Sequence, residues 1–368
     1  MSDPKGVRLT QLTLSDFRNY GSASFATGPA NVVFTGPNGA GKTNILEAIS
    51  LLSPGRGLRR SSYSDMGRRG TLGAWSVFAR LDKGGEEHGV GSGIAPNVST
   101  RRVRIDGNDG RADDLMRLAR VLWLTPAMDG LFPGPAADRR RFMDRMALAL
   151  HPDHGRRANA YERAMRQRNK MFEEGANDAR WFAATEREMA THGAAIAGAR
   201  VDMIVKLNGE QATRAEAGAD FPQALLGLTG DDGDADPSAF AARLEAGRDR
   251  DRAAGRALSG PHRVDLTITH VEKQMPAALA STGEQKALLI GIVLGHAALV
   301  ARQTGEPPIL LLDEVAAHLD PLRRAALYAT LDGLGAQTFM TGTDPSLFEA
   351  LGPDADRFAV AANMIVKV

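Results

Sequence analysis

The chain has 368 residues and no cysteine, which excludes a disulfide scaffold, cysteine-ligated zinc, an iron–sulfur cluster and a thiol nucleophile. Its 43% hydrophobic and 24% charged residues are typical of a soluble globular protein. Because 45 Lys and Arg residues oppose 44 Asp and Glu residues, any attraction to nucleic acid must come from local clusters of charge rather than from net charge.

The N-terminal part of the chain is predicted to be rich in β-strands. Residues 7–14 alternate apolar and polar side chains, as a half-buried strand does. A short run with β-branched residues at 31–35 leads directly into a glycine-rich turn. Further strands are expected at residues 74–81, 100–106 and 121–125.

The amino-acid composition changes between about residues 136 and 256. Ala, Arg, Glu and Met dominate this segment, and the spacing of its apolar residues predicts helices. These helices are expected at residues 136–150, 157–174 and 178–217. The acidic stretch 230–237 lacks the spaced ligands of an EF-hand, so we expect a solvated loop there rather than a calcium site.

Patterns of alternating strands and helices return in the C-terminal part. They predict strands at residues 262–270, 309–312 and 337–341, and helices at residues 284–302 and 322–333. We therefore expect an α/β domain, formed by residues 1–135 and 257–368, that is split in sequence by a helical insertion at residues 136–256.

No segment suited to export or to a membrane is apparent in the sequence. The first ten residues lack the apolar core of a secretory signal. The most apolar stretch, residues 287–300, is too short to cross roughly 30 Å of hydrocarbon. We expect a cytoplasmic protein without a membrane partner.

The strongest motif follows the predicted strand at residues 31–35. It matches the pattern G-x-x-x-x-G-K-[ST] and precedes a helix that is predicted to start near Lys42. Glycines there let backbone N–H groups point at phosphate oxygens. Lys42 is expected to reach the β- and γ-phosphates, and Thr43 to hold Mg²⁺. The residues expected to bind ATP in this segment are Gly36, Pro37, Asn38, Gly39, Ala40, Gly41, Lys42, Thr43 and Asn44.

A pair of acids, Asp313 and Glu314, follows the apolar run at residues 309–312. Such a run predicts a parallel strand buried on both faces, and ligands bind at the carboxyl edge of such sheets. We expect Asp313 to complete the Mg²⁺ site with Thr43, and Glu314 to position and deprotonate the attacking water. Lys42 and Glu314 are thus the expected catalytic residues. Alternatively, the two acids only cap the helix that follows.

The segment 281–286 reads Ser-Thr-Gly-Glu-Gln-Lys and opens a predicted helix. On its own it is typical of a capped helix start, with Ser281 as the N-cap and Glu284 as the acid of a capping box. The order of the motifs favours a second interpretation. A phosphate loop, then Ser-x-Gly-x-Gln, then an apolar strand with Asp-Glu, then His-Leu-Asp at residues 318–320 resembles the ABC ATPase superfamily.

The resemblance to ABC ATPases implies a site shared between two copies of the chain. It implies that Ser281, Gly283 and Gln285 contact ATP that is bound by the other copy. It also implies that Asp320 lies at the seam between the copies. Two ATP molecules would then be enclosed between two protomers.

Further segments narrow the resemblance to the RecF family. They span nearly the whole chain in the expected order and comprise residues 15–20, 43–49, 55–60, 139–144, 167–169, 258–263 and 281–286. The resemblance implies an ABC-type P-loop ATPase head with a mixed sheet and an inserted helical domain. It implies that Arg18 and Asn19 lie near the nucleotide; alternatively, they only form a turn after the first strand. It also implies an ATP-dependent homodimer with slow, DNA-stimulated ATP hydrolysis that binds double-stranded, gapped or junction DNA and RecR, and that promotes RecA loading in recombinational repair and replication restart.

Two basic segments are candidates for contact with DNA phosphates. Residues 139–170 contain ten Lys and Arg and three Asp and Glu, and residues 56–69 contain five Arg and one Asp. Such clusters can replace counterions on a nucleic acid and make its binding salt-dependent. Alternatively, they form solvated helix faces with ion pairs one turn apart, and Arg139–Arg141 support the nucleotide-binding domain.

Two other classes of function remain as alternatives. An ATPase subunit of a membrane transporter is expected to carry a switch histidine after the strand that follows the acidic pair, but here that strand ends in Thr341-Gly342-Thr343. We expect Thr341 or Thr343 to contact the γ-phosphate region instead. A scaffold with a relic nucleotide site is disfavoured because Lys42, Thr43 and both acids are present.

Overall fold

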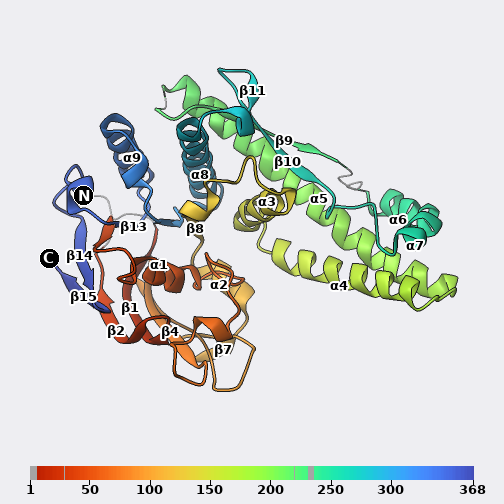
Figure 1. The fold of residues 1–368 in the computed structure, drawn as a ribbon, viewed down its shortest axis with the longest axis horizontal. Helices are drawn as coiled ribbons and strands as arrows, with labels where there is room; N and C mark the ends of the chain where they lie inside the picture. The colour runs from red at the N-terminus through yellow and green to blue at the C-terminus, as the bar shows by residue number, and fades with distance from the viewer. Residues whose placement is uncertain (1–5, 29, 219, 231–235) are drawn as a thin grey trace. The chain divides into compact units, whose positions relative to one another are not determined.

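The computed structural model describes residues 6–28, 30–218, 220–230 and 236–368 (Figure 1). Most of the predicted acidic loop therefore lies outside the described residues. The chain divides into two compact units, which are described separately. The first unit consists of Met1–Asp129 and Leu289–Val368, and the second consists of Gly130–Leu288.

The first unit contains a mostly parallel sheet with the strand order β15-β14-β3-β13-β12-β8. At its centre, β3 (Val32–Thr35) and β12 (Ile309–Leu312) both pair in parallel with β13 (Thr338–Gly342). The chain segments that follow these three strands therefore lie at the same edge of the sheet. All four residues of β12 are buried, as in a strand that is covered on both faces. The remaining strands are β8 (Val121–Leu124), β14 (Asp356–Ala361) and β15 (Met364–Lys367).

An antiparallel sheet with the order β2-β1-β4-β5-β6-β7 packs into the same unit. In β1 (Val7–Phe17), a bulge between Leu9 and Gln11 shifts the register by one residue. Because of this shift, Leu9, Leu12 and Leu14 all lie in the core. The other strands are β2 (Tyr20–Ala26), β4 (Trp75–Lys83), β5 (Glu86–Ile94), β6 (Arg102–Ile105) and β7 (Asn108–Gly110).

Helices α1 (Lys42–Ser50), α2 (Leu115–Leu118) and α9 (Pro321–Leu334) belong to the first unit, and the unit boundary falls within α8 (Thr282–Thr304). By length and composition alone, α8 is long and apolar enough to cross a membrane, with a mean hydropathy of 1.5, although 72% of its apolar window is buried in the protein. A buried core helix passes the same test, so this is weak evidence for a membrane span. Residues 287–300 were expected to be too short to cross a membrane. For the helix as a whole this expectation was wrong, because α8 extends beyond these residues at both ends.

The second unit is mainly helical. Its helices are α3 (Ala136–Leu150), α4 (His154–Glu173), α5 (Ala179–Glu216), α6 (Pro237–Ala246) and α7 (Arg248–Ala254). Figure 1 shows α4 running beside the long α5, which packs against it. Asp178 starts α5 because its carboxylate accepts hydrogen bonds from the N–H groups of Arg180 and Trp181. Tyr161, Met189 and Phe240 belong to one apolar core of this unit.

A small sheet of the order β11-β10-β9 also belongs to the second unit. β9 (Ala224–Thr229) pairs antiparallel with β10 (Asp265–His270), which pairs with β11 (Met275–Pro276). The expected end of the insertion at residue 256 therefore differs from the unit boundary after Leu288. The reason is that the partner of β10 lies inside the helical segment, where no strand was predicted.

A buried arginine joins the helices of the second unit. Arg168 in α4 is 0% exposed, and its guanidinium donates to Glu186 in α5 at 3.0 Å and to Asp251 in α7 at 2.6 Å. A third bond reaches the Leu244 carbonyl oxygen at 2.8 Å. Glu186 also pairs with Arg248. Although Arg168 is part of a basic segment predicted as a candidate for DNA contact, its guanidinium is used inside the fold.

We expect Arg168→Met to destabilise the second unit by about 3–5 kcal/mol, since it leaves two buried carboxylates without their shared cation. Arg166→Met is the matched control: that side chain is 65% exposed and, in the part of the chain that the structure describes, pairs only with Glu162 at 3.4 Å, so its loss changes stability by less than about 1 kcal/mol. Denaturant unfolding followed by circular dichroism measures both variants. Equal midpoints would show that the buried network does not stabilise the unit.

Candidate nucleotide-binding site

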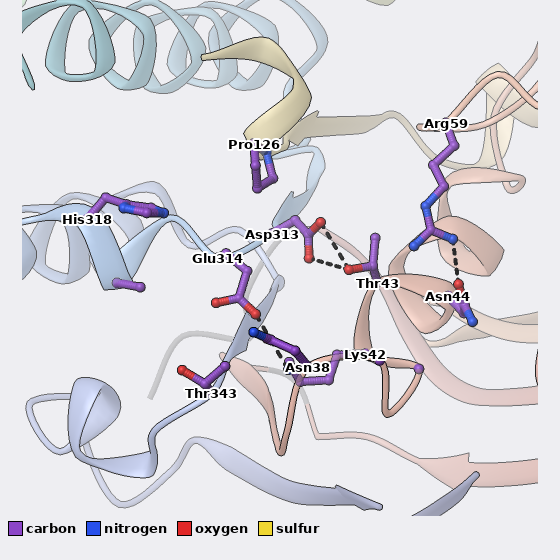
Figure 2. Close-up of a pocket in the computed structure, with 13 residues that line it drawn as sticks. Asn38, Lys42, Thr43, Asn44, Arg59, Pro126, Asp313, Glu314, His318 and Thr343 are labelled. Atoms are coloured by element: carbon purple, nitrogen blue, oxygen red, sulfur yellow. Dashed lines mark hydrogen bonds and ion pairs between the residues drawn. The ribbon is translucent and has the colours of Figure 1, made fainter. Parts of the chain in front are cut away.

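A pocket of about 550 Å³ lies in the first unit at the edge where β3, β12 and β13 end. Figure 2 shows its side chains converging from the phosphate-loop segment and from the segment after β12. The residues that line it are Asn38, Gly39, Gly41, Lys42, Thr43, Asn44, Arg59, Pro126, Asp313, Glu314, Ala317, His318 and Thr343.

Two glycines of the predicted phosphate loop are required by close packing. A Cβ at Gly36 would lie 2.1 Å from the Val360 carbonyl oxygen, and one at Gly41 would lie 2.5 Å from Asn19 Nδ2. Both residues have positive φ angles, of 152° and 112°, which side chains disfavour. The loop can therefore follow this path only with glycine at both positions, and it leads directly into the N-terminus of α1, which favours anions.

Lys42 is buried beside its own loop. Its Nζ donates to the carbonyl oxygens of Gly36 at 2.7 Å and Pro37 at 3.1 Å. The same Nζ lies 3.5 Å from Glu314 Oε1. The two residues expected to be catalytic therefore face one another in the pocket (Figure 2).

Thr43 and Asp313, the two residues expected to hold Mg²⁺, lie within hydrogen-bond distance of one another. Thr43 Oγ1 lies 2.9 Å from Asp313 Oδ1 and 3.1 Å from Oδ2. Asp313 is buried and its N–H donates to the Leu124 carbonyl oxygen of β8 at 2.9 Å, which fixes its backbone at the sheet edge. A hydroxyl and a carboxylate are ligands that Mg²⁺ takes beside nucleotide phosphates, so these two side chains fit that ion.

The neighbouring residues Arg18 and Asn19 contact different parts of the first unit. Asn19 Nδ2 donates to the loop carbonyl oxygen of Ala40 at 3.2 Å, and Asn19 Oδ1 accepts from Asn44 Nδ2 at 2.6 Å. Asn19 thus supports the phosphate loop through hydrogen bonds to Ala40 and Asn44. Arg18 forms a two-pronged ion pair with the buried Glu47 of α1, at 2.7 and 2.5 Å. Neither side chain lines the pocket.

The segment with Ser281 belongs to the second unit, where it caps α8. Ser281 N–H and Oγ both donate to Glu284 Oε2, at 3.0 and 2.8 Å, as in a capping box. Hydrogen bonds from Lys273 and from Ser281 lower the pKa of Glu284 to about 2. Gln285 Nε2 donates to the Ala280 carbonyl oxygen at 2.8 Å. Ser281 and Gly283 are exposed, so the capped tip is accessible to another molecule.

Asp320 lies in the first unit at the start of α9. Its Oδ1 accepts from the Arg323 N–H at 2.9 Å, so it is the N-cap of that helix. The side chain is 52% exposed. It does not line the pocket of its own chain.

Pro126, Arg59 and His318 line the pocket but were not among the predicted site residues. Pro126 follows β8, which is the parallel neighbour of β12, so the position after this predicted strand was a usable signal. Arg59 donates to Glu47 Oε2 at 2.9 Å and to Asn44 Oδ1. It reaches the pocket from a loop whose course no local pattern indicates.

Several of the basic residues in the predicted DNA-binding segments hold the fold together. Arg139 pairs with Asp265 at 2.9 and 2.6 Å, which lowers the pKa of that carboxyl. Arg140 donates to the Val264 carbonyl oxygen at 2.9 Å. Exposed arginines on α4 pair one turn away, as Arg156 does with Asp153 at 2.7 Å. Solvated ion pairs are therefore found in these segments, whereas Arg139 and Arg140 support the second unit rather than the unit that contains the nucleotide pocket.

Comparisons with known proteins agree in family over the whole chain. A family model described as "RecF/RecN/SMC N terminal domain" matches residues 8–360. A protein of Mesorhizobium japonicum named "DNA replication and repair protein RecF" is 53% identical over 359 residues, covering 95% of this chain and 94% of its own. A protein of the same name from Rhizobium etli is 52% identical over 372 residues, covering 98% and 99%.

Solved structures agree in fold. A structure of "the recombination mediator protein RecF-ATP in RecFOR pathway" has a TM-score of 0.87 at 20% identity, covering 100% of this chain and 99% of that one. An Smc head domain derived from Pyrococcus furiosus has a TM-score of 0.55 at 13% identity, covering 98% and 96%. The expected ABC-type ATPase head is thus confirmed as a fold.

Two relatives that match nearly the whole chain are both named RecF, so they do not support the alternative of a transporter subunit. With the family model and a phosphate loop that faces an Asp-Glu pair, they lead to one conclusion: the chain belongs to the RecF family of SMC-like ABC ATPases.

Proposed function

We propose that this chain is a slow, DNA-stimulated ATPase of the cytoplasm that uses ATP binding to close a homodimer on DNA. The observation that carries the proposal is the pocket in which Lys42, Thr43, Asp313 and Glu314 converge. Each residue type has a separate task in phosphoryl transfer, and the relatives named RecF are described as DNA replication and repair proteins.

The chemistry follows from the positions of these side chains. Mg²⁺, held by Thr43 and Asp313, would neutralise charge on the β- and γ-phosphates. Lys42 stabilises negative charge on the transferred phosphoryl group from its place beside the loop. The Glu314 carboxylate accepts a proton from the water that attacks the γ-phosphorus, while the bond from that phosphorus to the oxygen bridging to ADP breaks.

The proposal of a dimer is supported by residues that are exposed in the single chain. Ser281 and Gly283 at the tip of α8 are exposed, and Asp320 is half exposed at the start of α9. We propose that these residues and Gln285 complete the site of a second copy. ATP then stabilises only the closed dimer and acts as a switch between two populations.

The proposed nucleic acid is double-stranded, gapped or junction DNA. The proposed protein partner is RecR, and the proposed outcome is RecA loading. Aromatic residues are only 5% of the chain, so contact with the phosphate backbone is favoured over base stacking. Arg56, Arg69 and Arg163 are exposed basic side chains of the two predicted segments. They support contact with phosphates.

The test is molar mass by light scattering together with binding to gapped DNA, each with and without ATP. We expect ATP to double the mass and to raise the affinity for DNA, and the affinity to fall steeply as salt increases. A mass that stays monomeric with ATP would reject the dimer switch. A flat salt titration would show that basic side chains are not the contact surface.

A further inference from the structure

A single buried hydroxyl contacts both acids of the pocket. Thr341 lies in β13, one residue beyond the register pair of Leu312 and Met340, and is therefore beside Asp313. Its Oγ1 donates to Asp313 Oδ1 at 2.7 Å and accepts from the Glu314 N–H at 3.0 Å. The residue is 1% exposed, so water does not compete for either bond.

The direction of both hydrogen bonds is determined by the partners. A carboxylate can only accept and a backbone N–H can only donate, so the Thr341 proton must point at Asp313. Asp313 Oδ1 also accepts from Thr43 Oγ1 at 2.9 Å. With two hydroxyl donors on one oxygen, the plane of the Asp313 carboxylate is fixed relative to Thr43.

The hydrogen bond from the Glu314 N–H to Thr341 supports a rare backbone conformation at Glu314. Glu314 has a φ of +55°, in the left-handed region that residues with a Cβ seldom adopt. Its N–H is satisfied by Thr341, and its carboxylate faces Lys42 at 3.5 Å. The hydroxyl therefore stabilises the backbone conformation in which the Glu314 carboxylate faces Lys42 in the pocket.

We propose that Thr341 is a positioning residue that sets the geometry of Asp313 and Glu314 together. Of the two threonines named as alternatives for contact with the γ-phosphate region, Thr343 lines the pocket, whereas Thr341 does not. Thr341 acts through the two acids, on metal binding through Asp313 and on the base through Glu314. The inference rests on the proposed ATPase function of the same site.

The test compares Thr341→Val, which removes the hydroxyl and keeps the shape, with Thr341→Ser, which keeps the hydroxyl. Thr338→Val is the matched control, because Thr338 is buried in the same strand and, among the described residues, its hydroxyl donates only to the nearby Ala336 carbonyl oxygen, at 3.4 Å. Two properties are measured: steady-state hydrolysis, and the MgCl₂ concentration that gives half-maximal binding of a fluorescent ATP analogue.

For Thr341→Val we expect kcat to fall by about 10- to 100-fold and the half-maximal MgCl₂ concentration to rise by about 10-fold, as when a residue that orients a metal ligand is removed. KM for ATP and nucleotide binding without MgCl₂ stay as in the wild type. Thr341→Ser and Thr338→Val keep wild-type values. If the valine variant does not fold, Thr341→Ala takes its place in the same comparison.

A Thr341→Val variant that matches Thr338→Val in both measurements would overturn the inference, as would a Thr341→Ser variant that is as impaired as the valine one. Hydrolysis by the wild type tests the proposed function. The MgCl₂ dependence of nucleotide binding needs no hydrolysis, so it tests Thr341 separately.

Discussion

Replacing Glu314 with Gln is expected to slow ATP hydrolysis by roughly 10²- to 10⁴-fold, the usual contribution of a general base. Gln has nearly the same shape, so the phosphate loop, Thr43 and Asp313 still bind ATP. Because the bound ATP is no longer consumed, we expect the proposed dimer to accumulate. Single-turnover hydrolysis and light scattering with ATP measure the two effects.

The control for this variant is Glu349→Gln, which makes the same change of charge at an exposed residue of the same unit, outside the pocket. It should hydrolyse ATP at the wild-type rate and dimerise transiently. Wild-type hydrolysis in the Glu314→Gln variant would mean that another group takes the proton. A variant that stays monomeric with ATP would separate ATP binding from dimerisation.

Lys42→Met is expected to lower ATP affinity by about 10- to 100-fold, the effect of losing one or two hydrogen bonds to a charged group. The dimer and the gain in DNA affinity with ATP should be lost with it. Without the ammonium, the carbonyl oxygens of Gly36 and Pro37 also lose their donor. Titration of a fluorescent ATP analogue measures the affinity directly.

Lys170→Met provides the comparison for nucleotide binding, since that lysine is on the surface of α4 and pairs with Glu174 at 3.5 Å. Its ATP affinity should equal that of the wild type. If Lys42→Met still gained affinity for DNA on addition of ATP, nucleotide binding at this pocket could not be the switch.

The elements that form the site could be predicted because their signals are local. The phosphate loop, the apolar run of β12 and the acids after it each lie within a few consecutive residues. The parallel order of β3, β13 and β12 then brings the loop to the acids. Site residues that lie in short segments at strand ends can therefore be predicted from a single sequence.

Features that depend on distant partners were not predictable in the same way. β9 forms because β10 pairs with it from about forty residues further along the chain. Arg168 looks like a surface charge in the sequence, but Asp251 lies opposite it in the fold. Thr341 gains its role only because β13 and β12 are neighbours. In each case the decisive contact is tertiary, and no local pattern encodes it.

In the proposed dimer, the Ser281 end of one copy meets the nucleotide pocket of another. Because the chain has no cysteine, two differently tagged copies of the Glu314→Gln variant can carry one cysteine each, at the exposed positions Thr282 and Thr343. A short thiol crosslinker should join the two tags with ATP and not without it. If dimers form with ATP, as detected by their mass, but give no crosslink between these positions, the proposed arrangement of the two copies is contradicted.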